Sequence, residues 1–204
     1  GSTQATFPVT VGPDLTHNGG VDAFVAKVNA AGTALAYAGF LGGSSHDHGY
    51  GIAVDTAGNA YIAGYTQSTE ATFPVTVGPD LTFNGFGDAF VAKVNAAGSA
   101  LVYAGYLGGL DLDHGQGIAV DAAGVVTVAG NTESTNFPVT PGAVQSQYRG
   151  AQNSSPVWGG DGWAARINAT GSALVYCTYL GGRNDDIVTS VAVDSSGNTF
   201  LGGI

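Results

Sequence analysis

Three copies of one long repeat make up most of the 204-residue chain, and this repetition limits the folds open to it. The string FPVT occurs at 7–10, 73–76 and 137–140, and LGG occurs at 41–43, 107–109 and 180–182. The string DAFVAKVNAAG occurs at 22–32 and 88–98, with the version DGWAARINATG at 161–171. Self-similarity at a fixed long period is typical of repeat architectures, in which each unit packs against its neighbours. We therefore expect one array of similar structural units.

Each repeat contains four short strand candidates. The first is GIAVD at 51–55 and 117–121, and its third version is SVAVD at 190–194. Short turns that begin with Asp or Asn and contain Gly join the first strand to the second and the third to the fourth, as in antiparallel hairpins. Gly and Pro recur too often along the chain for long helices. Four antiparallel strands at a fixed period predict an all-β protein of the β-propeller type.

The strand order predicts four-stranded antiparallel blades and about three blade equivalents in the chain. A half blade is expected at 22–41, whole blades at 51–107 and 117–180, and a second half blade at 190–204. A closed propeller needs about 4–8 blades, so three should not form a ring. We expect the open strand edges to pair with another copy, two copies giving a six-bladed ring, or with further parts of a longer native chain.

The small first strand of each repeat is expected at the crowded centre of the propeller. Both faces of a blade pack against neighbouring blades, so the apolar side chains of this strand should be buried in every copy. These side chains are Ile52, Val54, Ile118, Val120, Val191 and Val193.

The charge balance and the cysteine count exclude several classes of protein. Lys and Arg total 5, and Asp and Glu total 15, which gives a net charge of -10. So few cations cannot form the basic patch that nucleic-acid binding needs. The single Cys177 excludes a disulfide scaffold. No apolar run reaches the roughly 18 residues of a membrane-spanning helix. The absence of Met indicates a processed product or a piece of a longer chain.

The segments that follow each LGG contain the candidate binding residues. Each segment has an Asp at the same repeat position, and the first two copies have a His after it: Asp47, His48, Asp113, His114 and Asp186. Carboxylate and imidazole groups suit a divalent cation such as calcium, or a sugar. In the alternative interpretation, each Asp holds its loop by accepting hydrogen bonds from backbone N–H groups. We favour the structural interpretation and predict no metal or cofactor.

The third copy has 9 extra residues in one loop, 141–160, and this loop brings a second group of candidates. Tyr148, Arg149 and Trp158 lie in it and could stack on a sugar or a protein partner, or else cover loop backbone. The sequence contains no G-x-S-x-G, no nucleotide-binding loop and no H-E-x-x-H. We therefore predict no catalytic residue and no enzymatic activity.

The order of these motifs resembles the SBBP repeat, a β-propeller repeat of bacterial secreted and surface proteins. The series runs from YLGG through GIAVD, GN and FPVTPGA to DAFVAK and ALVY, and NFPVTPGA at 136–143 is the closest stretch. The first two copies depart there, with VTVGPDLT in place of VTPGAVQS. The resemblance covers nearly all of the chain. It implies a propeller, a location outside the cell or on its surface, and no catalytic motif.

These observations leave three functions open. The favoured one is an extracellular or surface-exposed structural scaffold that interacts through its open strand edges, by self-association or with the rest of a longer chain. The alternative is a lectin-like propeller that binds glycans with its loops. The third, a metal-dependent hydrolase, is favoured least because the third copy has Ile187 where the first two have His.

Overall fold

The computed structural model describes residues 6–150 and 159–204, and within these ranges the chain is all β. The described residues form twelve strands and no helix. In chain order they are β1 (Ala23–Val28), β2 (Leu35–Leu41), β3 (Asp47–Val54), β4 (Ala60–Thr66), β5 (Asp88–Val94), β6 (Leu101–Leu107), β7 (Asp113–Val120), β8 (Val126–Thr132), β9 (Asp161–Ile167), β10 (Leu174–Leu180), β11 (Val188–Val193) and β12 (Thr199–Gly203). Accordingly, none of the described residues forms a helix long and apolar enough to cross a membrane.

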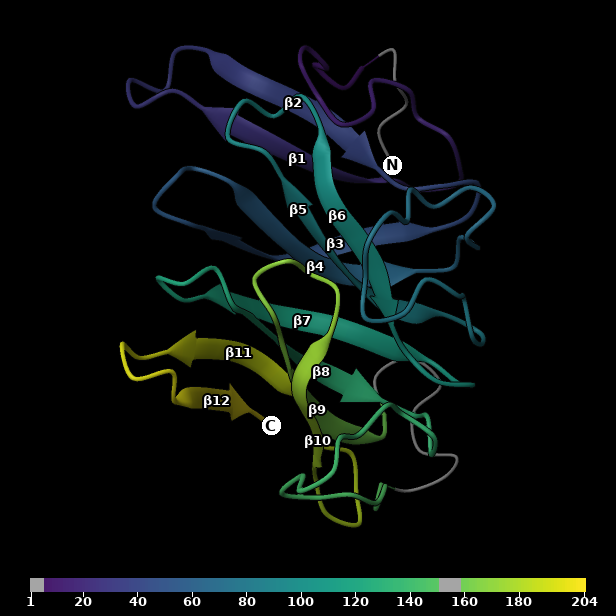
Figure 1. The fold of residues 1–204 in the computed structure, drawn as a ribbon. Helices are drawn as coiled ribbons and strands as arrows, with labels where there is room; N and C mark the ends of the chain where they lie inside the picture. Colours follow the sequence, from purple (N-terminus) through teal and green to yellow (C-terminus); the bar gives the residue numbers. More distant parts are fainter. Residues whose placement is uncertain (1–5, 151–158) are drawn as a thin grey trace.

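The strands form four separate antiparallel sheets. Two are four-stranded, with the orders β3-β4-β5-β6 and β7-β8-β9-β10, and two are two-stranded, β1-β2 and β11-β12. Figure 1 shows the two-stranded sheets at opposite ends of the molecule, with the four-stranded sheets between them. The predicted fold class of four-stranded antiparallel β-propeller blades is confirmed. The array is open, because no strand pairing among the described residues joins its two ends.

One side chain and one glycine make each tight turn between the first two strands of a blade. After β3, Asp55 Oδ1 accepts hydrogen bonds from the backbone N–H groups of Ala57 (3.0 Å) and Asn59 (2.9 Å). Gly58 has a φ of 86°, a left-handed conformation that an L side chain rarely adopts. This is why the D-x-x-G pattern recurs with the repeat.

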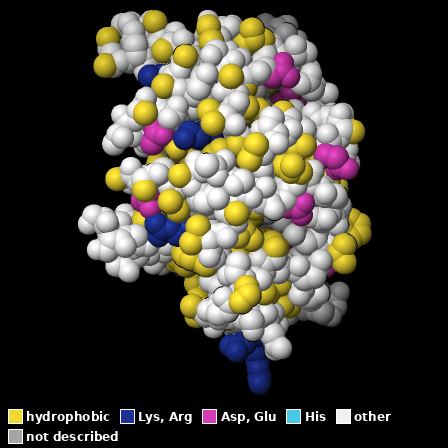
Figure 2. All heavy atoms as spheres, viewed as in Figure 1, with side chains coloured by type: hydrophobic (Ala, Val, Ile, Leu, Met, Phe, Trp, Pro, Cys, Tyr) yellow, Lys and Arg dark blue, Asp and Glu magenta, His cyan; other side chains and the backbone are white. Residues whose placement is uncertain are grey.

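The hydrophobic core lies between neighbouring sheets, on both of their faces. The largest cluster joins the two four-stranded sheets through Tyr61 and Tyr103 on one side and Trp163 and Tyr179 on the other. Every residue of β4 is buried. Because the sheets pack against neighbours on both faces, their strands can be apolar on both faces. This accounts for the small number of charged residues in the chain. The few charged side chains on the face in Figure 2 lie among uncharged ones, and dark blue and magenta groups adjoin along one side.

The first strands of successive repeats lie next to one another. β7 contacts both β3 and β11. A Cβ added to Gly51 would lie 3.0 Å from the Gln116 carbonyl oxygen and 3.2 Å from Ile118 Cγ2. Small residues in this strand therefore allow the close approach that the sequence predicts for the centre of a propeller.

The prediction that all apolar side chains of these inner strands are buried is wrong for the first copy. Ile52 is 58% exposed and Val54 is 61% exposed, whereas Ile118 is 8% exposed. β3 and β4 of the preceding sheet contact β7 and cover Ile118. The sheet that precedes β3 consists of β1 and β2 alone, so nothing described lies where the first two strands of that blade would cover β3.

The remaining inner-strand side chains are only partly buried. Val120, Val191 and Val193 have intermediate exposure. Val191 packs against the small cluster between the β7–β10 sheet and the β11–β12 sheet. The β11–β12 sheet contains only the first two strands of a blade and lacks the outer two.

Candidate functional site

Asp47 fixes the loop that leads into β3. Its Oδ2 accepts hydrogen bonds from Gly43 N (2.7 Å) and Ser68 Oγ (2.9 Å), and its Oδ1 accepts one from Thr66 Oγ1. The side chain is fully buried. Burial raises the pKa of Asp47. Both carboxylate oxygens are thus engaged by donors of the protein itself.

The same arrangement recurs at the start of β7. Asp113 Oδ2 accepts from Gly109 N (2.7 Å) and Ser134 Oγ (3.0 Å), and Thr132 Oγ1 donates to Oδ1. Asp113 is fully buried, and this burial raises its pKa well above the ordinary range.

The third copy keeps the central contact of this motif. Gly182 N donates to Asp186 Oδ2 at 2.7 Å, but Asp186 is only partly buried. The three Asp residues therefore occupy equivalent positions and hold loop backbone, as the structural interpretation predicts. Within the described ranges, no three His, Cys, Asp or Glu side chains are grouped so that they could hold a metal ion.

A second set of Asp residues lies beside the first, one next to each loop Asp: Asp22, Asp88 and Asp161. A Cβ added to Gly108 would lie 2.4 Å from Asp88 Oδ1 and 3.0 Å from Asp113 Oδ2. The glycine thus leaves room for two carboxyl groups. Burial raises the pKa of Asp88 to about 7, with a further contribution from the charge of Asp80. The sequence signal for this pair of carboxyl groups is that both Asp positions, that of Asp88 and that of Asp113, recur in every copy of the repeat.

The two histidines lie in an aromatic layer and do not share a face with the carboxylates. His114 stacks on Tyr65 with ring centroids 4.5 Å apart, and His48 stacks on Tyr50 at 6.0 Å. Burial lowers the pKa of His114 to about 4, helped by the neighbouring His48. Consecutive strand residues point to opposite faces. Asp47 accordingly pairs with Thr66, and His48 is opposite Tyr65.

The insertion of the third copy packs against its own blade. The Tyr148 ring meets Tyr179 edge-on, with centroids 6.0 Å apart. The Arg149 backbone N–H donates to Asp161 Oδ2 at 2.7 Å, and Gln145 Nε2 donates to the same oxygen at 2.9 Å. These contacts agree with the interpretation that the segment covers loop backbone. Trp158 lies outside the described residues.

A cation in the third strand of each complete blade pairs with the first turn of that blade. Lys93 Nζ lies 3.8 Å from Asp55 Oδ2 and 4.8 Å from the centroid of the Tyr61 ring. In the next blade, Arg166 Nη2 lies 2.5 Å from Asp121 Oδ2. The equivalent Lys27 of β1 is exposed and makes no ion pair within the described ranges.

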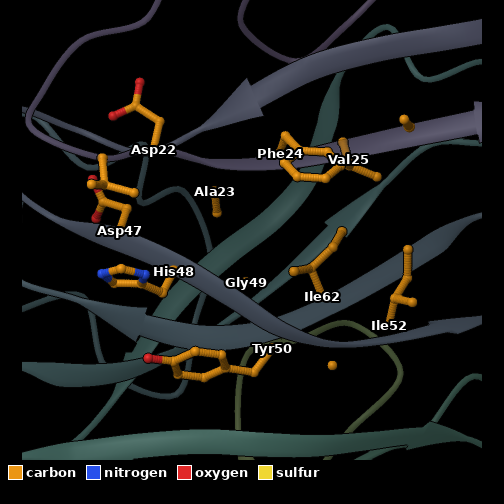
Figure 3. Close-up of a pocket in the computed structure, with 13 residues that line it drawn as sticks. Asp22, Ala23, Phe24, Val25, Asp47, His48, Gly49, Tyr50, Ile52 and Ile62 are labelled. Atoms are coloured by element: carbon orange, nitrogen blue, oxygen red, sulfur yellow. The ribbon is translucent and has the colours of Figure 1, made fainter. Parts of the chain in front are cut away.

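A groove of ≈ 480 Å³ lies between β1 and β3. Figure 3 shows Phe24 and Val25 on one wall and Tyr50 and Ile52 on the other, with Ile62 between them. Asp47 and His48 line one end. We call this site the β1–β3 groove. The sequence of a repeat does not predict this groove, because the groove depends on which strands are absent beside β3.

A second open site lies at the other end of the molecule. It measures ≈ 400 Å³, and its lining includes Ala164, Tyr176, Leu180 and Leu201. We call it the β12 hollow. Both sites are mainly apolar, and each adjoins a two-stranded sheet.

Comparison with known proteins agrees with this architecture. No curated protein matches the chain. One family does match, in two segments that begin in the fourth strand of one blade and continue into the first two strands of the next. The resemblance inferred from the sequence is thereby confirmed: residues 36–70 and 175–203 match SBBP, the beta-propeller repeat.

Proposed function

We propose that this chain is a non-catalytic propeller scaffold that recruits further β-strands through its two open half blades. One observation carries the proposal. Phe24 of β1 is 58% exposed and Phe200 of β12 is 60% exposed, whereas the equivalent Phe90 and Tyr61 of the complete blade are fully buried. The two ends therefore expose apolar side chains whose equivalents in the interior of the array are buried.

Edge strands with exposed apolar side chains are pairing surfaces. An unpaired edge offers backbone N–H and C=O groups to another strand, and proteins without a partner usually shield such edges with charges or bulges. Here β1 carries one cation, Lys27, and β12 carries no charge. Burial of the exposed side chains supplies the driving force for pairing.

The proposal includes a location outside the cell or on its surface. It is supported by the acidic balance of 15 Asp and Glu against 5 Lys and Arg, and by the similarity to the SBBP repeat. Antibody labelling of intact cells that make the protein tests this location. Labelling that requires lysis of the cells would contradict it.

Light scattering of the 204-residue chain at micromolar concentration tests the recruitment of strands. We expect a mass that is a multiple of 20.2 kDa. Ile52→Lys should weaken association, because it places a charge in the β1–β3 groove. Val102→Lys is the matched control, because Val102 is 50% exposed but lines neither site. A wild-type chain that stays monomeric would contradict the proposal.

A further inference from the structure

The proposed function leaves open which strands enter the open edges. We propose that the β11–β12 hairpin of a second copy of this chain fills the β1–β3 groove, with the partner's Asp194 paired to Lys27. This inference rests on the proposed function and adds the occupant, the register and the residues that specify it.

The two half blades together contain each strand of one blade once. In a complete blade the order is β3-β4-β5-β6. By repeat position, β11 and β12 correspond to β3 and β4, and β1 and β2 correspond to β5 and β6. Joining β12 of one copy to the free edge of β1 in another therefore produces the order β11-β12-β1-β2.

The complete blade also fixes the register of this joint. In the β4–β5 pair, Gly64 lies opposite Phe90 and Ile62 lies opposite Ala92. A Cβ added to Gly64 would lie 2.6 Å from Phe90 Cε1, so the phenyl ring covers a position that must be glycine. The equivalent residues place the partner's Gly203 under the exposed ring of Phe24.

The same register covers the exposed face of β3. Ile118 owes its burial to the first two strands of the preceding blade. A β11–β12 hairpin in the β1–β3 groove would supply the first two strands of the blade that precedes β3. It would bury Ile52 and Val54 in the way that β3 and β4 bury Ile118.

The docking covers the opposite end of the partner at the same time. Leu180 in the β12 hollow is 40% exposed, whereas its equivalent Leu107 is 1% exposed beneath the next blade. Tyr176 is partly exposed, and its equivalent Tyr103 is fully buried. A β1–β2 hairpin joined to β12 would lie over this hollow. One arrangement therefore fills both open sites.

Charge distinguishes this joint from unspecific strand pairing. Both complete blades pair the cation of the third strand with the Asp of the first turn, as Lys93–Asp55 and Arg166–Asp121. In the half blades these two positions are Lys27 and Asp194. Asp194 Oδ2 accepts a hydrogen bond from Asn198 Nδ2 at 2.8 Å, as Asp55 Oδ2 does from Asn59 at 2.7 Å. The partner's Asp194 is thus oriented to receive Lys27.

Two copies satisfy the geometry of closure. Each contributes two complete blades and two half blades. Two copies give the equivalent of six, within the roughly 4–8 that close a propeller. A head-to-tail interface of this kind forms a ring when its rotation closes.

Charge reversal with exchange of copies tests the inference. Lys27→Asp and Asp194→Lys, each alone, place like charges at both joints of a ring. Each should weaken association at least about tenfold. Mixing the two variants in equal amounts makes both joints oppositely charged, so the mixture should recover the wild-type mass, twice 20.2 kDa. Recovery also shows that both variants fold. Arg149→Asp is the control, because it makes the same change in charge at a residue that lines neither open site.

A disulfide between copies gives an independent measurement of the register. Ala26→Cys with Leu201→Cys should form a covalently linked dimer on oxidation, because their equivalents Ala92 and Ile62 are directly opposite. Ala26→Cys with Phe200→Cys, shifted by one residue, should link poorly. The native Cys177 is buried and does not compete.

The outcomes separate the two proposals. A wild-type chain that is monomeric contradicts the proposed function. A chain that associates, but whose charge variants do not recover on mixing or whose shifted cysteines link equally well, keeps the proposed function and overturns this inference. Open polymers in place of a dimer overturn the closed ring of two copies that this inference includes.

Discussion

Asp88 is a buried acid whose surroundings favour its neutral form. Its Oδ2 accepts a hydrogen bond from Asn84 N at 3.0 Å, whereas its Oδ1 has no hydrogen-bond partner within the described ranges. Burial raises its pKa from 3.8 to about 7. The residue is fully buried, so this acid acts on stability and is not open to a substrate.

This shift predicts how the stability of the chain depends on pH. The folded chain holds the Asp88 proton more tightly than the unfolded chain. Its stabilising contribution is therefore complete below the ordinary pKa of 3.8 and is lost as the pH rises through about 7. Asp88→Asn should remove this part of the pH dependence. Urea unfolding of both proteins across this range measures the difference, and parallel stability curves would contradict the prediction.

At the scale of the strands, position within the array decides burial. Ile52 and Ile118 occupy the same repeat position in β3 and β7, but only Ile118 lies beneath two strands of a preceding blade. β3 also begins at Asp47, before the predicted start at Gly51. A bulge between Gly49 and Gly51 lets its pairing with β4 continue past that point.

Substitution of the two isoleucines separates the effects of residue and position. Ile118→Ala should lower the free energy of unfolding by roughly 2–5 kcal/mol, as for other buried large-to-small changes. Ile52→Ala should cost much less in the Lys27→Asp background, which keeps the groove open. Chemical denaturation measures both. Equal losses would show that the groove does not exist in solution.

The positions of the strands could be predicted because each repeat contains the local sequence signals for them. Turns such as Asp55 to Asn59 and two-sided apolar strands such as β4 carry their own local signals. The three loop Asp residues could be predicted to hold backbone, because they recur at one position. The β1–β3 groove could not be predicted in this way, since no residue within a repeat records whether the neighbouring strands are present. The opposite orientation of Asp47 and His48 follows from strand alternation alone.

At the scale of the whole molecule, the chain has two unlike ends that complete each other. One end offers the last two strands of a blade, and the other offers the first two (Figure 1). Sheets in the interior of the array are covered on both faces by neighbouring sheets. Among the described residues, each two-stranded sheet at an end has a neighbour on one face only. Association and folding should therefore be thermodynamically linked.

This linkage predicts a melting temperature that rises with protein concentration. A partner that binds only the folded state stabilises it by mass action. The wild-type chain should melt at higher temperature as its concentration increases, and Lys27→Asp should melt at a lower temperature than the wild type at the same concentration. Scanning calorimetry over a wide range of concentration makes this measurement. A constant melting temperature for an associated wild-type chain would show that the joint adds no stability.

The division of a blade between the two ends has a consequence for how such genes change. Duplication or loss of any stretch one period long adds or removes a whole blade, and both ends stay as they were. The proposed joint would then keep its residues while the number of repeats between the two half blades varies. A ring closed by this joint would change in size through recombination of repeats, without a new interface.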